Sequence, residues 1–329
     1  MTSTTTAATT HQLDVPGGRL YYEVRGTGPL LLVVGQPMTS GAFASFADLL
    51  AEDHTVVTYD PRGLGQSTVD DPSLAVTPEI QADDLALLVE ALDRGPADIF
   101  GSSGGAVAGL ALVARHPERV RTLVAHEPPV TELLADAPYV RPVVDGVEDA
   151  YRSGGSGAGW GAFVSLVMHQ GPVTEAGVAP TTWPPRDDTA PDDTAPDDTA
   201  PDDTAPDDTA PDDTAPDHTA PDDTAPDQVP AAPAAPPAKQ QADDELFFLR
   251  MLKPFTRYEP PADVLRSAGP EVVVAVGAAS TSELAVRSAV ALAERLGVTP
   301  VVFPGDHAGL MGDPAGFADT LRQVLPTAS

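Results

Sequence analysis

Short apolar runs alternate with longer segments of helical periodicity along most of this sequence. Seven of these runs predict strands, at residues 19–24, 30–34, 55–59, 98–100, 120–125, 271–276 and 300–303. The last five are almost continuously apolar, which is typical of strands buried on both faces of a parallel sheet. The alternation predicts an α/β fold, with a mostly parallel sheet flanked by helices.

Helical segments fill the intervals between the apolar runs. The clearest helix start is at Thr77, whose side chain can cap a helix, with Pro78 following at the first helical position. Further helices are predicted at residues 105–115, 282–296 and 314–324. The first of these helices lie between predicted strands, as an α/β fold requires, and the helix at 314–324 follows the last strand.

One interval is far too long for a single crossover helix. About 140 residues separate the runs at 120–125 and 271–276, where a few tens would suffice. Helical patterns recur inside it at 131–149, 159–169 and 243–258. We interpret residues 131–268 as a helical cap inserted into a core made of residues 12–130 and 269–329, after a disordered N-terminal tail at 1–11.

A low-complexity repeat interrupts the predicted cap. Residues 187–228 are eight copies of DDTAP, one of which reads DHTAP, followed by Asp227 and Gln228. A proline in every unit and the absence of large apolar side chains favour neither a helix nor a sheet. We therefore predict a disordered acidic linker over residues 187–238. The alternative, divalent-cation binding by the paired aspartates, lacks the glycine-containing spacing of a calcium loop.

The composition narrows the classes of partner. The chain has 18 Lys and Arg against 49 Asp and Glu, a formal net charge of −31 that would repel nucleic acid and anionic lipids. The apolar runs are too short to span a bilayer, and the first residues lack the pattern of a secretion signal. With no cysteine, disulfides and cysteine-based metal sites are excluded. We expect a cytoplasmic protein without membrane contact, metal or other cofactor.

The strongest chemical signal is Gly101-Ser102-Ser103-Gly104-Gly105, between the strand at 98–100 and the helix at 105–115. This is a G-x-S-x-G pattern in the strand–turn–helix context that it requires. The sharp turn leaves no room for side chains two residues on either side of the serine, so the outer glycines are steric requirements. Ser103 is therefore a candidate nucleophile, and the N–H of Gly104 a candidate oxyanion donor.

A nucleophilic serine needs a base, for which seven histidines are available. His307 follows the last predicted strand and precedes the last helix, at the carboxyl edge where Ser103 lies. His126 also follows a strand at this edge and is the one serious rival. For the second oxyanion donor we propose Gln36, in the loop after the strand at 30–34.

These motifs, in this order, resemble the α/β-hydrolase superfamily, in the group with a lid inserted after the sixth strand. The resemblance covers residues 13–129 and 271–325 and rests on G-Q-P, D-P-R-G-x-G-x-S, G-S-S-G-G and G-D-H. It implies a Ser–His–acid triad that includes Ser103 and His307, with Gln36 and Gly104 at the oxyanion positions.

Two features depart from the pattern of that superfamily. Val34 stands where the oxyanion motif usually has histidine. The commonest acid position, just after the strand at 271–276, has no carboxylate before Glu283. Some members carry the acid after the strand that follows the nucleophile helix, which here points to Glu127. Glu127 is our first candidate and Glu283 the alternative; Asp306, or no acid, remains open.

The sequence thus predicts a serine hydrolase that cleaves a small carboxylic ester or lactone through an acyl-Ser103 intermediate. A non-catalytic protein of the same fold that binds a small hydrophobic ligand is the alternative. A haloalkane dehalogenase or epoxide hydrolase is disfavoured, because its nucleophile would be aspartate at position 103. The identity of the small-molecule substrate and the oligomeric state are left open.

Overall fold

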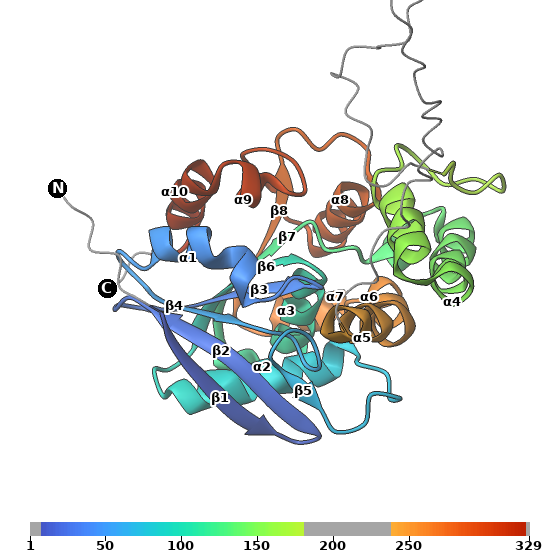
Figure 1. The fold of residues 1–329 in the computed structure, drawn as a ribbon. Helices are drawn as coiled ribbons and strands as arrows, with labels where there is room; N and C mark the ends of the chain where they lie inside the picture. Colours follow the sequence, from blue (N-terminus) through green and yellow to red (C-terminus); the bar gives the residue numbers. More distant parts are fainter. Residues whose placement is uncertain (1–7, 181–237, 327–329) are drawn as a thin grey trace, which may run out of the picture. The chain divides into compact units, whose positions relative to one another are not determined.

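A nine-stranded sheet forms the centre of the computed structural model, which describes residues 8–180 and 238–326 (Figure 1). Its strands are β1 (Thr9–Val15), β2 (Gly18–Arg25), β3 (Leu30–Gln36), β4 (Thr55–Tyr59), β5 (Thr68–Val69), β6 (Ala97–Ser103), β7 (Val120–His126), β8 (Glu271–Gly277) and β9 (Val301–Phe303). The order is β1-β2-β4-β3-β6-β7-β8-β9, with short β5 beside β2. Strand β2 pairs antiparallel with β1, β4 and β5. All pairs along the order from β4 to β9 are parallel. The predicted fold class is confirmed.

All seven predicted apolar runs contribute strands to this sheet, whereas β1 and the two-residue strand β5 were not foreseen. The tail predicted over residues 1–11 is wrong from Thr9 onward, because β1 begins there and pairs with β2 from Thr9 opposite Val24 to Val15 opposite Gly18. Most β1 side chains are exposed and polar. Backbone pairing at the sheet edge forms this strand, so hydrophobicity carried no signal for it. Residues 1–7 lie outside the described part.

The strand register brings the ends of the central strands to one edge. Gln36 of β3 lies opposite Ser103 of β6, and Ser102 lies opposite His126 of β7. His126 in turn pairs with Ala275 of β8. Residues that follow these parallel strands therefore meet at the carboxyl edge of the sheet.

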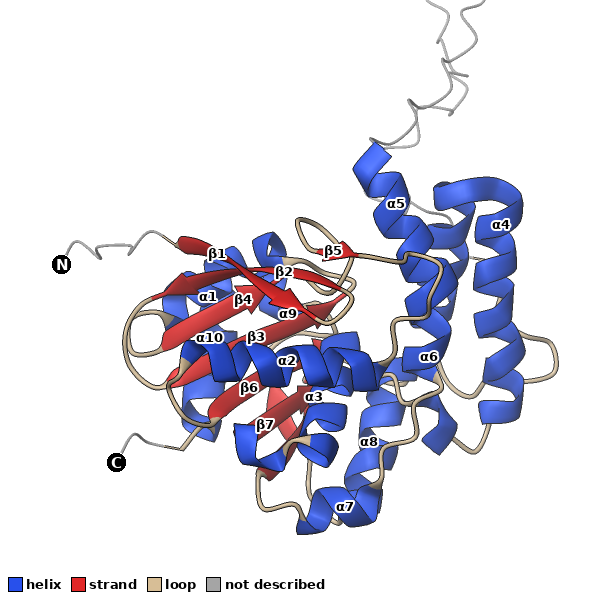
Figure 2. Cartoon of the chain, turned by 90° about the horizontal axis from the view of Figure 1, so that it is seen from below, coloured by secondary structure: helices blue, strands red, loops and turns tan. Residues whose placement is uncertain are grey.

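Helices cover both faces of the sheet (Figure 2). On one face, α1 (Ala44–Leu50) packs against α10 (Pro314–Val324) over an apolar cluster that includes Phe46, Phe100 and Phe317. On the other lie α2 (Pro78–Leu92), α3 (Gly104–Arg115) and α8 (Leu284–Leu296). The predicted cap of α2 is present, since Thr77 Oγ1 accepts a hydrogen bond from the Ile80 N–H at 3.4 Å.

Between β7 and β8 the described chain is helical, as predicted for the cap. It contains α4 (Ala137–Val167), α5 (Ala238–Leu246), a π-helical turn at Phe247–Met251, α6 (Leu252–Thr256) and α7 (Ala262–Ser267). Both helices predicted before the repeat belong to α4, which is kinked at Gly155, where φ is 70°. Helix α5 already begins at Ala238, the last residue assigned to the linker; the DDTAP repeat itself lies outside the described residues.

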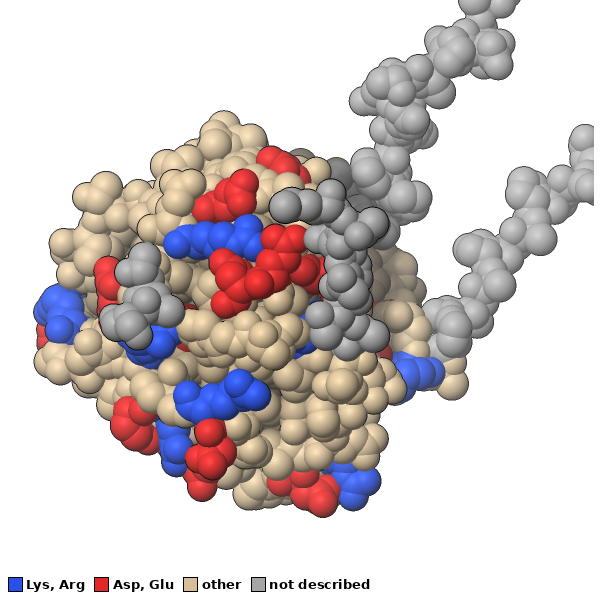
Figure 3. Space-filling view, turned by 90° about the vertical axis from the view of Figure 1, so that its left-hand side faces the viewer, with Lys and Arg blue, Asp and Glu red and all other residues tan. Residues whose placement is uncertain are grey.

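Charged side chains of both signs lie next to each other on the face shown in Figure 3. Among the described residues, Arg19 forms an ion pair with Asp14, and Arg322 forms one with Asp53. Among the helices of the described residues, none is long and apolar enough to cross a membrane.

Candidate active site

Ser103 occupies a strained turn at the end of β6. Its φ of 55° and ψ of −123° are unfavourable for a residue with a side chain, and it caps α3 directly. A Cβ on Gly101 would lie 2.7 Å from the Ala106 Cα, and one on Gly105 would lie 2.2 Å from the Val34 carbonyl oxygen. The outer glycines of the motif are therefore sterically required, and the turn lifts Ser103 to the carboxyl edge.

His307 and Glu127 form a hydrogen-bonded pair at the same edge. His307 lies in the loop between β9 and α9 (Gly309–Gly312), and Glu127 directly follows β7. The His307 Nδ1 is 2.7 Å from Glu127 Oε2, while Glu127 Oε1 accepts the N–H of Gly277 at 2.9 Å. The carboxylate follows β7, the N–H that binds it ends β8, and the imidazole comes from the loop after β9.

The environment of Glu127 favours its ionised form. The residue is 1% exposed, and burial raises the pKa of its carboxyl; hydrogen bonds from His307, Ser280 and Gly277 outweigh burial and lower the pKa to about 2. The carboxylate is charged at neutral pH and accepts the proton on His307 Nδ1. This tautomer leaves Nε2 of the imidazole as a proton acceptor.

Ser103 and His307 line one cavity between the sheet edge and the cap. Its lining is mostly apolar and includes Phe163 and Leu166 of α4, Phe255 of α6 and Leu284 of α8. The polar side chains in the lining are those of Gln36, Ser103, Thr256 and His307. A small, largely apolar molecule would fit against the serine and the imidazole.

Both residues proposed for the oxyanion hole border this cavity. Gln36 ends β3 directly beside Ser103, and Gly104 is the first residue of α3. The N–H groups of a helix's first turn have no partner within the helix, so that of Gly104 can bind a developing negative charge. A Cβ on Gly104 would lie 3.0 Å from the Cβ of Gln36, so the two residues are in close contact.

The alternative acids have other partners. The carboxylate of Glu283 accepts hydrogen bonds from the side chain of Gln170 at 2.6 Å and from the N–H of Thr281 at 2.8 Å. Asp306 is exposed, and its Oδ1 accepts the N–H of Ala308 at 2.9 Å. Of the candidate carboxylates, the structure brings Glu127 to His307.

The rival base His126 is a core residue. It is fully buried beside Phe100, Phe303 and Phe317, and its ring stacks on that of His307 at 6.2 Å between centroids. Neither ring nitrogen has a hydrogen-bond partner within the described protein, and burial lowers the pKa of His126 to about 4. Its imidazole is therefore neutral and lies behind His307, outside the cavity lining.

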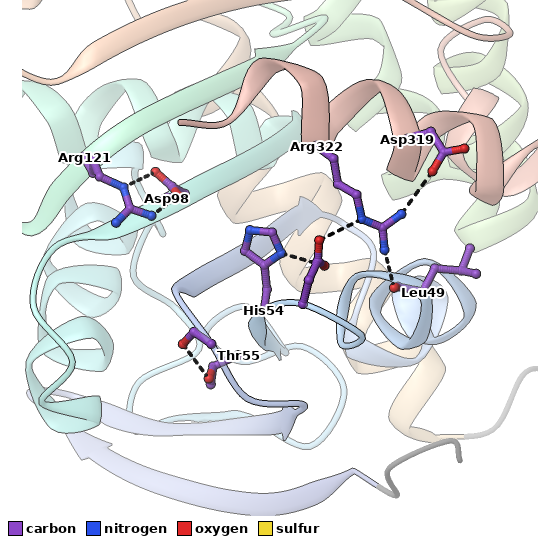
Figure 4. A network of polar contacts seen from close by, with 9 residues as sticks. Leu49, His54, Thr55, Asp98, Arg121, Asp319 and Arg322 are labelled. Carbon is purple, nitrogen blue, oxygen red and sulfur yellow. Dashed lines mark hydrogen bonds and ion pairs between the residues drawn. The ribbon is translucent and has the colours of Figure 1, made fainter. Parts of the chain in front are cut away.

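Other histidines lie away from the cavity. His54, before β4, binds Asp53, which also binds Arg322 of α10 (Figure 4). His116 binds Asp83 at 2.7 Å. In the part of the chain that the structure describes, no three acidic or histidine side chains gather closely enough to hold a metal ion.

Two polar features of the site carried no sequence signal. The Gly277 N–H that binds Glu127 belongs to the backbone of β8, and residue type does not reveal where a backbone N–H points. The Gln36 carboxamide was not singled out, because the sequence indicated only the backbone donor of that residue. Packing of distant strands creates both features.

Comparison with known proteins identifies related chains. The alpha/beta hydrolase fold family matches residues 28–216. The uncharacterized hydrolase YraK of Bacillus subtilis is 42% identical over 123 residues, which are 37% of this chain and 45% of YraK. Zearalenone hydrolase of Bionectria ochroleuca is 32% identical over 127 residues, 37% of this chain and 48% of that protein. The matches thus span about half the length of these curated relatives.

A solved structure covers nearly the whole chain. The thermophilic esterase of Thermogutta terrifontis matches with a TM-score of 0.61 and 18% identity, over 97% of each chain. At this level of identity the similarity establishes a shared fold.

Proposed function

The chain belongs to the α/β-hydrolase family, and from this premise we propose that it is a serine hydrolase that cleaves a small carboxylic ester or lactone. The observation that carries the proposal is the contact between His307 and Glu127 beside a cavity that Ser103 also lines. A nucleophile, a base and an oriented carboxylate at one edge are the parts that acyl transfer requires.

In the proposed reaction, Ser103 Oγ attacks the carbonyl carbon while His307 Nε2 takes the hydroxyl proton. The N–H groups of Gln36 and Gly104 bind the oxyanion that forms. When the carbonyl is restored, the bond to the leaving oxygen breaks, and His307 returns the proton to it, so that an alcohol departs. Glu127 stabilises the imidazolium during both transfers.

The second half of the reaction releases the acid. Water attacks the acyl-Ser103 ester and gives a proton to His307 Nε2. The bond between the acyl carbon and Ser103 Oγ then breaks, and that proton returns to the serine. For a lactone, the alcohol and the acid released are two ends of one molecule.

The lining of the cavity supports a small, largely apolar substrate. The cap side chains that line it are apolar except for Thr256, whose hydroxyl hydrogen is bonded to the Leu252 carbonyl oxygen. Such a lining favours short acyl and alkyl groups and disfavours charged ones, because a charge there would lose its hydration. Comparing short nitrophenyl esters with small lactones would separate the two substrate classes.

Covalent labelling tests the proposal against the non-catalytic alternative. A fluorophosphonate should label Ser103, and Ser103→Ala should lose the label together with at least about 10³-fold in kcat. Ser102→Ala is the matched control, since Ser102 is buried beside Ser103 without a hydrogen-bond partner among the described residues. A wild-type chain that binds esters yet neither hydrolyses them nor takes the label would favour the ligand-binding alternative.

A further inference from the structure

Gln36 carries a buried carboxamide that binds nothing in the described protein. The residue is 3% exposed, and neither its Nε2 nor its Oε1 has a hydrogen-bond partner among residues 8–180 and 238–326. Burying an amide without partners is unfavourable, because it gives up its bonds to water. Nearly all buried polar groups in folded proteins are paired, so this one calls for a partner that the described residues do not supply.

The cavity supplies the place for that partner. Gln36 lines it together with Ser103 and His307, which have the tasks of nucleophile and base. Thr256, the remaining polar side chain of the lining, already donates its hydroxyl hydrogen to the Leu252 carbonyl at 2.8 Å. Within the described lining, the Gln36 carboxamide is thus the polar side chain left to recognise a substrate.

Gly104 keeps the Gln36 side chain close to the reacting carbonyl. A Cβ at position 104 would lie 3.0 Å from Gln36 Cβ and 3.3 Å from its Cγ, closer than most real contacts. Glycine there lets the stem of Gln36 pack directly on the backbone whose N–H faces the oxyanion. The carboxamide follows Cγ directly and belongs to a side chain that lines the cavity together with Ser103.

We propose that Gln36 selects esters with a hydrogen-bond donor on the carbon next to the carbonyl, of which 2-hydroxy esters are the simplest class. This inference rests on the proposed function. In a 2-hydroxy ester, the hydroxyl and the carbonyl oxygen lie side by side. Gln36 Nε2 donates to the carbonyl oxygen as a third oxyanion donor, and Oε1 accepts the hydroxyl hydrogen, which satisfies both ends of the amide.

Three esters test the selection, two of equal size and one larger by a single carbon atom. Ethyl 2-hydroxypropanoate has the donor, ethyl 2-methylpropanoate has a methyl in its place, and ethyl 2-methoxypropanoate keeps the electron withdrawal without the donor. Hydrolysis followed by pH-stat gives kcat/KM for each. We expect Gln36→Met to lower the preference for the hydroxy ester over both others about tenfold or more relative to wild type.

Two further variants sharpen the result. Thr256→Val removes a hydroxyl of the same cavity that is already bonded, so the preference should stay as in wild type. Gln36→Glu keeps an acceptor and loses the donor to the oxyanion, so all three esters should slow while the hydroxy preference survives. If the preference for the hydroxy ester is lost in Gln36→Glu, the role given to Oε1 is contradicted.

Stability provides an independent measurement. Gln36→Met removes an unpartnered buried amide, so we expect the Tm to rise by about 2–4 °C. A lower Tm would assign the amide a structural role and overturn the inference. An unchanged preference in Gln36→Met would also overturn it while leaving the serine-hydrolase proposal intact. If the wild-type protein hydrolyses none of the esters and is not labelled by fluorophosphonate, both the selection by Gln36 and the serine-hydrolase proposal are refuted.

Discussion

Replacing Glu127 with glutamine tests the orientation of the candidate triad. In the structure Glu127 Oε1 accepts the Gly277 N–H at 2.9 Å, and Oε2 faces His307 Nδ1 at 2.7 Å. In Glu127→Gln, the amide oxygen must take the Gly277 N–H, because two donors cannot face each other. The new NH₂ group then faces His307 Nδ1, which must become an acceptor. The imidazole proton moves to Nε2, the atom that should receive the proton of Ser103.

The expected loss is large and falls on the chemical step. Holding the base in the wrong tautomer costs about 10⁴-fold in kcat in a serine hydrolase, whereas KM should change little. Glutamine is nearly isosteric and keeps the bond to Gly277, so the fold should survive. Stopped-flow or steady-state kinetics with a nitrophenyl ester, together with circular dichroism, would measure both effects.

The same substitution changes how the free energy of unfolding depends on pH in the acidic range. Burial raises the pKa of Glu127, but the hydrogen bonds from His307, Ser280 and Gly277 lower it by more, so that the pKa falls from 4.5 to about 2. This shift represents roughly 3 kcal/mol of free energy of unfolding. Because the folded-state pKa is depressed, that contribution is present above pH 4.5 and is lost as the pH falls toward 2. In Glu127→Gln this part of the pH dependence should disappear.

Glu283→Gln is the control. The carboxylate of Glu283 binds Gln170 and the N–H of Thr281, so its replacement should change kcat only a few-fold. If Glu283→Gln loses most of its kcat and Glu127→Gln keeps it, the acid of the triad lies after β8 and the assignment of Glu127 is refuted.

Two further predictions concern the core and the repeat. His126→Phe should keep kcat/KM within a few-fold. It should also reduce the loss of unfolding free energy between pH 6.5 and 4, because burial lowers the pKa of His126 to about 4 and only the unfolded chain takes up this proton in that range. Urea unfolding at pH 7.5 and 5 measures this loss, and a 10³-fold loss of activity would restore His126 as a candidate base. Deleting residues 187–228 should leave Tm and kcat nearly unchanged, because shortening a linker of the predicted kind alters its closure free energy by fractions of a kcal/mol. Calorimetry and nitrophenyl ester kinetics measure this, and a large loss of either would give the repeat a role.

The parts of the fold that sequence could predict are those encoded locally. The interior strands are continuous apolar runs, because both faces of a parallel sheet are buried. The turn at Ser103 is also local, since its strained backbone demands Gly101 and Gly105 two residues away. Where strand, turn and helix follow each other directly, the residues determine the geometry without reference to the rest of the chain.

Features that depend on packing between distant parts of the chain could not be predicted from the sequence. Strand β1 has few buried side chains and forms through its backbone pairing with β2. The burial of His126 among phenylalanines of three different elements could not be read from its place after a strand, which is why it competed with His307. That the carboxamide of Gln36 has no partner among the described residues became visible only when their positions were known.

The position of the acid has a steric explanation in the loop that carries His307. A Cβ on Gly277, at the end of β8, would lie 2.7 Å from the Gly305 carbonyl oxygen and 2.8 Å from the Asp306 Cα. The backbone before His307 thus presses on the end of β8, and a carboxylate at residue 277 would displace it. β7 lies next to β8, so a residue after β7 approaches the imidazole from the neighbouring strand. Glu127 does so with a φ of 45°, and the N–H of Gly277 is its second hydrogen-bond donor. We therefore expect Gly277→Ala to weaken the contact between Glu127 and His307 and to lower kcat, even though position 277 contributes no side chain to the reaction.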